Sequence, residues 1–151
     1  MPLVETNVQI VGVPRQAIWD TLIDFEAYPS FMDDVISVEY LRRYSSSAES
    51  AWSVLLNGSE LRWIERDDFR PLERIDFEQI EGDIEIWQGF WEISDAAHGF
   101  DVRLQVEFDI GIPSLSDILN PIGARAIKAN CRRMLTGLQS RSMRGGQLVS
   151  G

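Results

Sequence analysis

The sequence has few of the residues on which metal and nucleophilic chemistry depend. Its 151 residues include one cysteine, Cys131, and one histidine, His98. A single cysteine cannot close an internal disulfide, and a zinc site draws its three or four ligands chiefly from cysteine and histidine. With so few of either residue, zinc sites and histidine-based catalytic triads are excluded, and we expect no metal site.

Long hydrophobic runs and a basic leader are also missing. No stretch approaches the ~18 consecutive apolar residues of a membrane span. Residues 1–13 alternate apolar with polar residues and contain no basic segment of the kind that begins a signal peptide. We therefore expect a cytoplasmic protein without stable membrane insertion.

Acidic residues are absent after Asp117, whereas six of the 14 basic residues follow Asn120. With eight basic and 24 acidic residues, positions 1–119 carry a net charge of −16, and the remaining positions carry +6. This pattern is typical of a solvated basic helix face above an acidic sheet rim. Because phosphate binding needs a net positive local field, we expect no nucleic-acid partner.

Length and composition indicate one ordinary globular domain. Hydrophobic residues make up 44% of the chain and charged residues 25%, which matches soluble folded proteins. A chain of 151 residues is long enough to build one real core. We place this domain at residues 1–144 and expect a disordered tail at 145–151, after Gly145 and Gly146.

The first third of the chain predicts one strand and two short helices. Residues 4–11 alternate as a strand, and Pro14 suits the start of a helix whose apolar residues recur at helical spacing. Tyr28-Pro29 is expected to break this helix, and Phe31-Met32 adds a short turn. Six further strands are predicted at 35–44, 48–56, 59–69, 73–80, 85–94 and 99–110.

Asn57-Gly58 is a strong hairpin signal, because both residues accept positive φ. A two-residue turn there pairs Val54 with Leu61 and Trp52 with Trp63. One face of this hairpin then carries Trp52, Val54, Leu56, Leu61, Trp63 and Glu65. Arg66 points to the opposite face, across from Glu49, unless a bulge shifts its strand by one residue.

A second hairpin follows from the turn at Ala97-His98, which pairs Trp91 with Leu104 and Gly89 with Val106. Ile75 and Phe77 can join the same buried face through a three-residue turn that places Gly82 in the left-handed region. The inward side of these strands therefore carries Phe77, Trp87, Gly89, Trp91, Ile93, Leu104, Val106 and Phe108.

After Pro113 the periodicity becomes helical, with an apolar stripe of Leu119, Ile122, Ala126, Ile127, Cys131, Met134 and Leu138. The spacing predicts a helix from Asp117 to about Arg141. The whole chain therefore predicts an α+β fold: a curved seven-stranded antiparallel sheet around a long C-terminal helix, with two short helices after strand one. A single helix covers only part of a sheet face that carries so many aromatic residues, so we expect a cavity between the sheet and the helix. The alternative, for each aromatic residue taken singly, is that it packs the core.

The chain resembles the helix-grip proteins of the START and birch-pollen-allergen (Bet v 1) type, in particular their polyketide cyclase/dehydrase and coenzyme Q-binding (SRPBCC) branch. The resemblance runs from Val4 to about Arg141. It rests on Pro14, Trp19, Leu22, Asp24 and Tyr28-Pro29, on IDFEQIEGDIEIWQGFWEI with Gly82, Gly89 and Trp91, and on Ala129-Asn130 with Met134 and Leu138. It implies a deep cavity for sterols, quinones, lipids or polyketides, no metal or organic cofactor, an acyl carrier protein as a candidate partner, and a monomer or homodimer.

Two functions follow from this resemblance. In a polyketide aromatase/cyclase, the pocket folds a reactive chain, and we expect Glu65 and Arg66 as catalytic residues; Glu65 is otherwise a solvated rim carboxylate. The family's cyclases tend to place an arginine inside the pocket, so an outward Arg66 speaks against catalysis. The alternative is a non-catalytic quinone or lipid carrier. A translation inhibitor acting at the ribosome is disfavoured by the acidic body. The expected ligand contacts are Tyr28, Trp52, Trp63, Phe77, Gln79, Trp87, Trp91, Leu104, Phe108 and Asn130.

Overall fold

The computed structural model describes residues 2–56, 58–111 and 116–150. Seven antiparallel strands form one sheet in the order β1-β7-β6-β5-β4-β3-β2. The strands are β1 (Leu3–Ile10), β2 (Val35–Arg43), β3 (Ser47–Leu56), β4 (Ser59–Arg70), β5 (Arg74–Gly82), β6 (Ile86–Ala96) and β7 (Gly99–Asp109). The helices are α1 (Arg15–Ile23), the 3₁₀ helix η1 (Phe25–Ser30) and α2 (Ser116–Ser150). The predicted α+β helix-grip fold is therefore confirmed.

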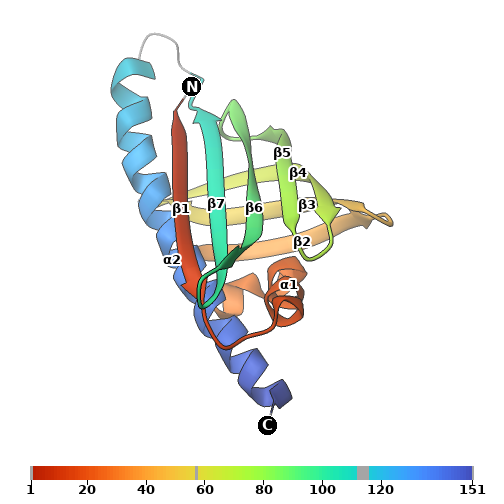
Figure 1. Ribbon diagram of the computed structural model, residues 1–151. Helices are drawn as coiled ribbons and strands as arrows, with labels where there is room; N and C mark the ends of the chain where they lie inside the picture. Colours follow the sequence, from red (N-terminus) through yellow and green to blue (C-terminus); the bar gives the residue numbers. More distant parts are fainter. Residues whose placement is uncertain (1, 57, 112–115, 151) are drawn as a thin grey trace.

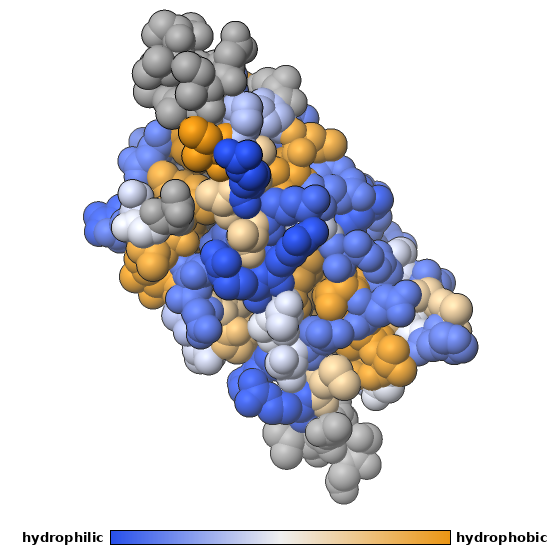
Figure 2. Space-filling model, turned by 90° about the vertical axis from the view of Figure 1, so that its left-hand side faces the viewer, coloured by the Kyte–Doolittle hydropathy of each residue, from blue (hydrophilic) through white to orange (hydrophobic). Residues whose placement is uncertain are grey.

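The sheet bends strongly, so that β2, β3 and β4 run across the direction of β1, β7 and β6 (Figure 1). Helix α2 lies along β1 and passes across the concave side, while α1 and η1 close the lower end beside β2 (Figure 1). Among the described helices, none is long and apolar enough to cross a membrane. The core occupies the space between the bent sheet and α2. On the one face that Figure 2 shows, hydrophilic and hydrophobic residues are intermingled.

The predicted hairpin registers are confirmed. Trp52 pairs with Trp63 and Val54 with Leu61 across the β3–β4 turn, where Gly58 has a φ of 83°. Asn57 lies outside the described residues. In the second hairpin Trp91 pairs with Leu104 and Gly89 with Val106, and β5 joins it through the pairs Ile75–Trp91 and Phe77–Gly89. Turn chemistry and strict alternation were sufficient to place these side chains on one face.

Gly82 has a different role from the one predicted. It is the last residue of β5, and the glycines with positive φ in the described chain are Gly12, Gly58 and Gly111. Between β4 and β5 the register shifts, because Ile64 pairs with Glu81 whereas Glu65 pairs with Gln79. Gly82 then lies opposite Trp63, where an added Cβ would come within 2.5 Å of the Trp63 Cβ atom. The glycine therefore permits a close approach at a β-bulge.

Three helix predictions need correction. Pro29 lies inside η1, because a 3₁₀ turn accommodates it where an α-helix would not. Helix α2 continues past Arg141 and through Gly145 and Gly146 to Ser150, since glycine weakens a helix by about 1 kcal/mol without forbidding it. The disordered tail at 145–151 and the 1–144 domain boundary stay predictions. Ile122 is exposed, since it is turned about 140° from Ile127 on the buried stripe.

Candidate functional site

The candidate site is a cavity enclosed between the sheet and α2. Aromatic side chains from four strands form most of its wall, and three residues of α2 close it. Its lining consists of Trp52, Trp63, Glu65, Phe77, Trp87, Trp91, Leu104, Val106, Asn130, Cys131 and Met134. Glu65 is the one ionisable carboxyl group in this lining, and the described lining contains no lysine or arginine.

The cavity is far smaller than the deep pocket expected from the sequence. It offers about 20 Å³ to a water-sized sphere, roughly the space of one water molecule. Bulky rings occupy the interior: the indoles of Trp52 and Trp63 stack with centroids 5.7 Å apart, and Trp87 lies 4.9 Å from Trp63. A ligand of one aromatic ring therefore enters only if lining side chains move. Met134 is the most adaptable of them, because it has three rotatable side-chain bonds.

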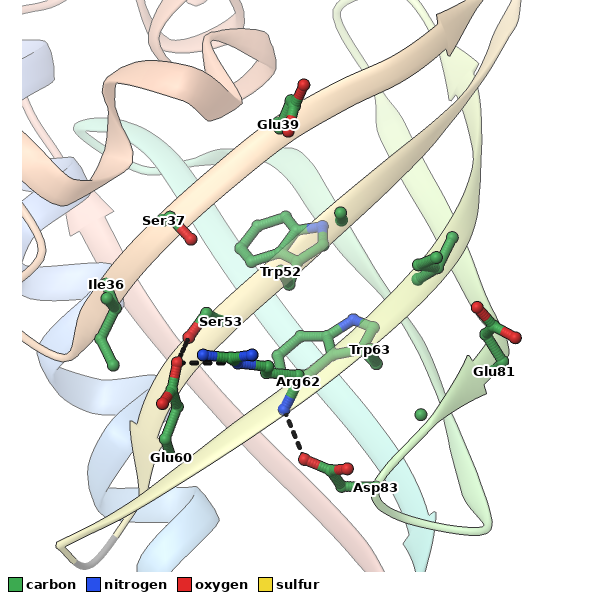
Figure 3. A pocket seen from close by; sticks show the side chains of 13 residues that line it. Ile36, Ser37, Glu39, Trp52, Ser53, Glu60, Arg62, Trp63, Glu81 and Asp83 are labelled. Atoms are coloured by element: carbon green, nitrogen blue, oxygen red, sulfur yellow. Dashed lines mark hydrogen bonds and ion pairs between the residues drawn. The ribbon is translucent and has the colours of Figure 1, made fainter.

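A larger hollow lies on the outer face of β2 to β5 (Figure 3). This groove of about 830 Å³ is open to solvent, and several of its charged groups already have hydrogen-bond partners: Glu60 accepts from Ser53 Oγ (2.6 Å) and Arg62 Nε (2.9 Å). Asp83 accepts from the Arg62 backbone N–H at 2.8 Å. Because these exposed groups already have hydrogen-bond partners, the cavity between the sheet and α2 is the better candidate for a functional site.

Most of the predicted contacts line the cavity. Eight of the predicted site residues are in its wall: Trp52, Trp63, Glu65, Phe77, Trp87, Trp91, Leu104 and Asn130. Asn130 also ties α2 to the sheet, since its amide donates to Asp34 Oδ2 (3.3 Å) and to the Leu55 carbonyl (3.5 Å). That these eight residues contact a ligand stays a prediction.

Three predicted contacts lie outside the cavity wall. Tyr28, a predicted ligand contact, is fully buried against Trp52 and donates its hydroxyl hydrogen to the Leu22 carbonyl. Gln79 pairs with Glu65 across β4 and β5 but is not part of the lining, and its side-chain amide supports the β5–β6 turn by donating to the Ile84 carbonyl at 2.6 Å. Phe108 packs against α2 near Gly123.

Arg66 points away from the cavity. No register shift separates it from Glu65, so alternation along β4 puts the two on opposite faces. Its side chain is 64% exposed and pairs with Asp68 at 3.3 Å. Arg66 therefore takes no part in the site proposed here, and the catalytic role predicted for it is withdrawn.

Glu65 is the polar centre of the cavity. Only 3% of its surface is exposed, and Trp63 Nε1 donates to its Oε1 at 2.7 Å. Burial, followed by the charge of Asp67, raises the pKa of Glu65 well above its ordinary value. With so little exposed surface, Glu65 is not the solvated rim carboxylate of the alternative, and its raised pKa favours the protonated acid.

Sequence reasoning missed Asp67, the second buried carboxyl. Alternation along β4 puts Trp63, Glu65, Asp67 and Phe69 on one face, so the signal was present beyond Glu65. Asp67 is fully buried and accepts from Ser50 Oγ at 2.6 Å. Burial raises its pKa to about 6, although the interaction with Glu65 and the hydrogen bond from Ser50 act in the opposite direction.

Val106, Cys131 and Met134 were also missed as lining, although each belongs to a predicted buried stripe. Burial raises the pKa of the Cys131 thiol to about 12, so it stays protonated and is a poor nucleophile. These three residues are therefore apolar wall.

Residues 11–135 match the model of the family described as polyketide cyclase/dehydrase and lipid transport. The chain belongs to this family. Its members include both cyclising enzymes and lipid transporters by that description, so membership leaves catalysis open. A comparison with curated protein sequences finds no match.

Solved structures support the fold of this polyketide cyclase/dehydrase family protein. TTHA0849 from Thermus thermophilus superposes with a TM-score of 0.87 at 24% identity, covering 95% of this chain and 98% of the other. The Zhui aromatase/cyclase from Streptomyces sp. R1128 superposes with a TM-score of 0.80 at 18% identity, and the match covers 95% of this chain and 94% of the other. A START superfamily protein from Mycobacterium smegmatis superposes with a TM-score of 0.74 at 18% identity, and the match covers 94% of this chain and 97% of the other. At these identities the likeness shows the fold alone.

Proposed function

We propose that this protein binds a hydrophobic polyketide or aromatic intermediate between the sheet and α2 and directs its cyclisation and dehydration. The observation that carries the proposal is a buried carboxyl group, Glu65, set among four tryptophans in the cavity wall, where burial raises its pKa and favours the acid form. Aromatic walls suit a flat, partly aromatised ligand, because ring pairs add about 0.5–1.5 kcal/mol beyond area burial. The acid supplies the one proton donor that the reaction needs inside such a wall.

One carboxyl group, that of Glu65, can both donate and take back the proton that the reaction requires. A carbon–carbon bond forms between an enolised carbon and a ketone carbonyl of the same chain, and the Glu65 proton goes to the carbonyl oxygen. The carboxylate left behind takes the hydroxyl proton that the enol releases as its oxygen becomes a ketone, which restores the acid. In dehydration the same acid protonates the departing hydroxyl group as water, and its carboxylate removes the neighbouring C–H proton.

The wall contributes by holding the two reacting carbons together. Positioning of this kind can lower a barrier by ~7–11 kcal/mol, while proton transfer contributes a further ~10²–10⁴-fold. In the proposal the stacked Trp52–Trp63 pair is the rigid part of the mould and Met134 the adjustable part. An acyl carrier protein as donor, a cytoplasmic location and a monomeric or homodimeric state belong to this proposal as predictions.

A non-catalytic carrier of quinones or lipids is the second candidate, and the position of Arg66 favours it. With Arg66 on the outer face, no cation lines the described cavity to hold an enolate or a thioester carbonyl. A carrier needs only an apolar wall that opens, and the family description includes lipid transport.

A reconstituted polyketide pathway separates the two candidates. The protein is added to a minimal polyketide synthase that releases an uncyclised poly-β-ketone chain, and products are quantified by liquid chromatography and mass spectrometry. We expect a shift from the spontaneous mixture to one cyclised, dehydrated product. An unchanged mixture, together with saturable tryptophan quenching by quinones or lipids, would assign the carrier function instead.

A further inference from the structure

Glu65 and Asp67 form a buried carboxyl pair on β4, and none of the ion pairs among the described residues includes either of them. Glu65 faces the cavity, whereas Asp67 lies behind the wall. Asp67 Oδ2 accepts from Ser50, and Oδ1 has no partner within hydrogen-bond distance in the described part of the chain. An anion buried with so little compensation is costly, so the pair favours retaining a proton.

The pair also holds the two stacked tryptophans. Trp63 Nε1 donates directly to Glu65 Oε1 at 2.7 Å. Trp52 Nε1 donates to Ser50 Oγ at 2.8 Å, and Ser50 in turn donates to Asp67. Both indole N–H groups are thus anchored, one directly and one through Ser50, to members of the same carboxyl pair.

The neighbouring groups do not neutralise the pair. Tyr28 of η1 and Tyr40 of β2 donate their hydroxyl hydrogens to the backbone carbonyls of Leu22 and Ile23, so neither satisfies Asp67. The carboxylate of Asp68, exposed on the other face of β4, adds negative charge nearby. The guanidinium group of Arg43 lies over the Tyr40 ring, 4.3 Å from its centroid, and forms none of the ion pairs described above with either carboxyl group. On β5, the residue paired with Asp67 is the uncharged Phe77.

We propose that Ser50 and Asp67 are positioning residues that retain one shared proton on the Glu65–Asp67 pair and fix the Trp52–Trp63 wall. At neutral pH the proton resides on Glu65, facing the cavity, and Asp67 carries the single negative charge, held by Ser50. Protonation of Asp67 in mildly acidic solution removes this charge and changes the environment of Trp52 through Ser50. The proposal rests on the proposed function and gives a role within it to a buried acid that never touches the ligand.

Intrinsic tryptophan fluorescence of the ligand-free protein tests this relay between pH 4.5 and 8. Burial raises the pKa of Asp67 to about 6, so we expect a transition in wild type near that pH. Asp67→Asn removes the transition. Ser50→Ala removes a hydrogen bond that favours the anion, and therefore moves the midpoint upward by about one pH unit.

Two matched variants serve as controls. Asp68→Asn changes an exposed carboxylate one residue away, and Ser53→Ala removes a serine that donates to the outer Glu60. Ser53→Ala should leave the midpoint unchanged, whereas Asp68→Asn should lower it slightly, because a nearby negative charge that raises the pKa of Asp67 is removed. A transition that persists in Asp67→Asn, or a midpoint unmoved in Ser50→Ala, overturns the proposal. If Asp67→Asn does not fold, the Ser50→Ala shift decides alone. No substrate is needed, so a failed cyclisation assay and a failed relay are separate results.

Discussion

Asp67→Asn is expected to raise the free energy of unfolding at pH 8 by about 3 kcal/mol. Burial raises the pKa of Asp67 from 3.8 to about 6, and each pKa unit corresponds to ~1.4 kcal/mol. Between these two pH values the folded protein binds more protons than the unfolded chain, so stability falls as pH rises, and above about pH 7 the full cost is present. Asparagine has nearly the same shape, keeps an acceptor for Ser50 and carries no charge.

Urea denaturation at pH 4.5 and pH 8 measures this effect. The gain should fall to about 1 kcal/mol at pH 4.5, where most of the folded wild-type protein is already neutral at Asp67. Asp68→Asn, whose carboxylate is exposed, should change stability by less than about 0.5 kcal/mol at either pH. A loss of stability at both pH values would show that the Asp67 charge supports the fold. A gain would show that the buried charge is retained at the expense of stability, as is common at functional sites.

Glu65→Gln is expected to reduce the rate of directed cyclisation by about 10²–10⁴-fold, the range of a lost general acid. Glutamine keeps an acceptor for the Trp63 N–H group, so the shape of the wall is conserved while the transferable proton is lost. Binding of an aromatic ligand should change by less than about threefold, because the wall supplies the binding energy. Single-turnover product formation in the reconstituted pathway measures the rate, and equilibrium titration measures binding.

Two outer-face variants control for indirect effects of Glu65→Gln. Glu78→Gln alters a carboxylate across from Arg66, and Arg66→Ala removes the exposed arginine itself. Both should cyclise at the wild-type rate. Equal rates in wild type and Glu65→Gln would remove Glu65 from the mechanism, and a slow Arg66→Ala variant would show that the outer face takes part.

The fold could be predicted because local signals coincide with the global arrangement. Asn57-Gly58 fixed one register, and alternation carried it along β3 and β4 to Trp52, Trp63 and Glu65. The same alternation reaches Asp67, which was missed because a run of charged residues, Glu65 to Asp68, is typical of a solvated face. Burial of a carboxylate there depends on η1 and β2 covering that end of the sheet, and such coverage is a tertiary property.

The size of the cavity could not be predicted from residue types. The same inward tryptophans are compatible with an open pocket or a filled one, and the difference depends on ring orientations set by Ser50 and Glu65. The end of α2 escaped prediction for a related reason, since a glycine pair lowers helix propensity without deciding the outcome. Sequence patterns thus place side chains on faces, whereas packing decides how closely the faces meet.

Native mass spectrometry with an anthraquinone ligand tests the central claim most directly, namely that the space between the sheet and α2 opens to admit a hydrophobic ring system. The measurement compares wild type with Val106→Phe, which adds a ring inside the cavity wall, and with Ile80→Phe, which adds one on the exposed bulge of β5. We predict a saturable 1:1 complex for wild type and Ile80→Phe, and a tenfold or greater loss of affinity for folded Val106→Phe. Equal binding by all three proteins, or none by wild type across aromatic, quinone and lipid ligands, would contradict the account.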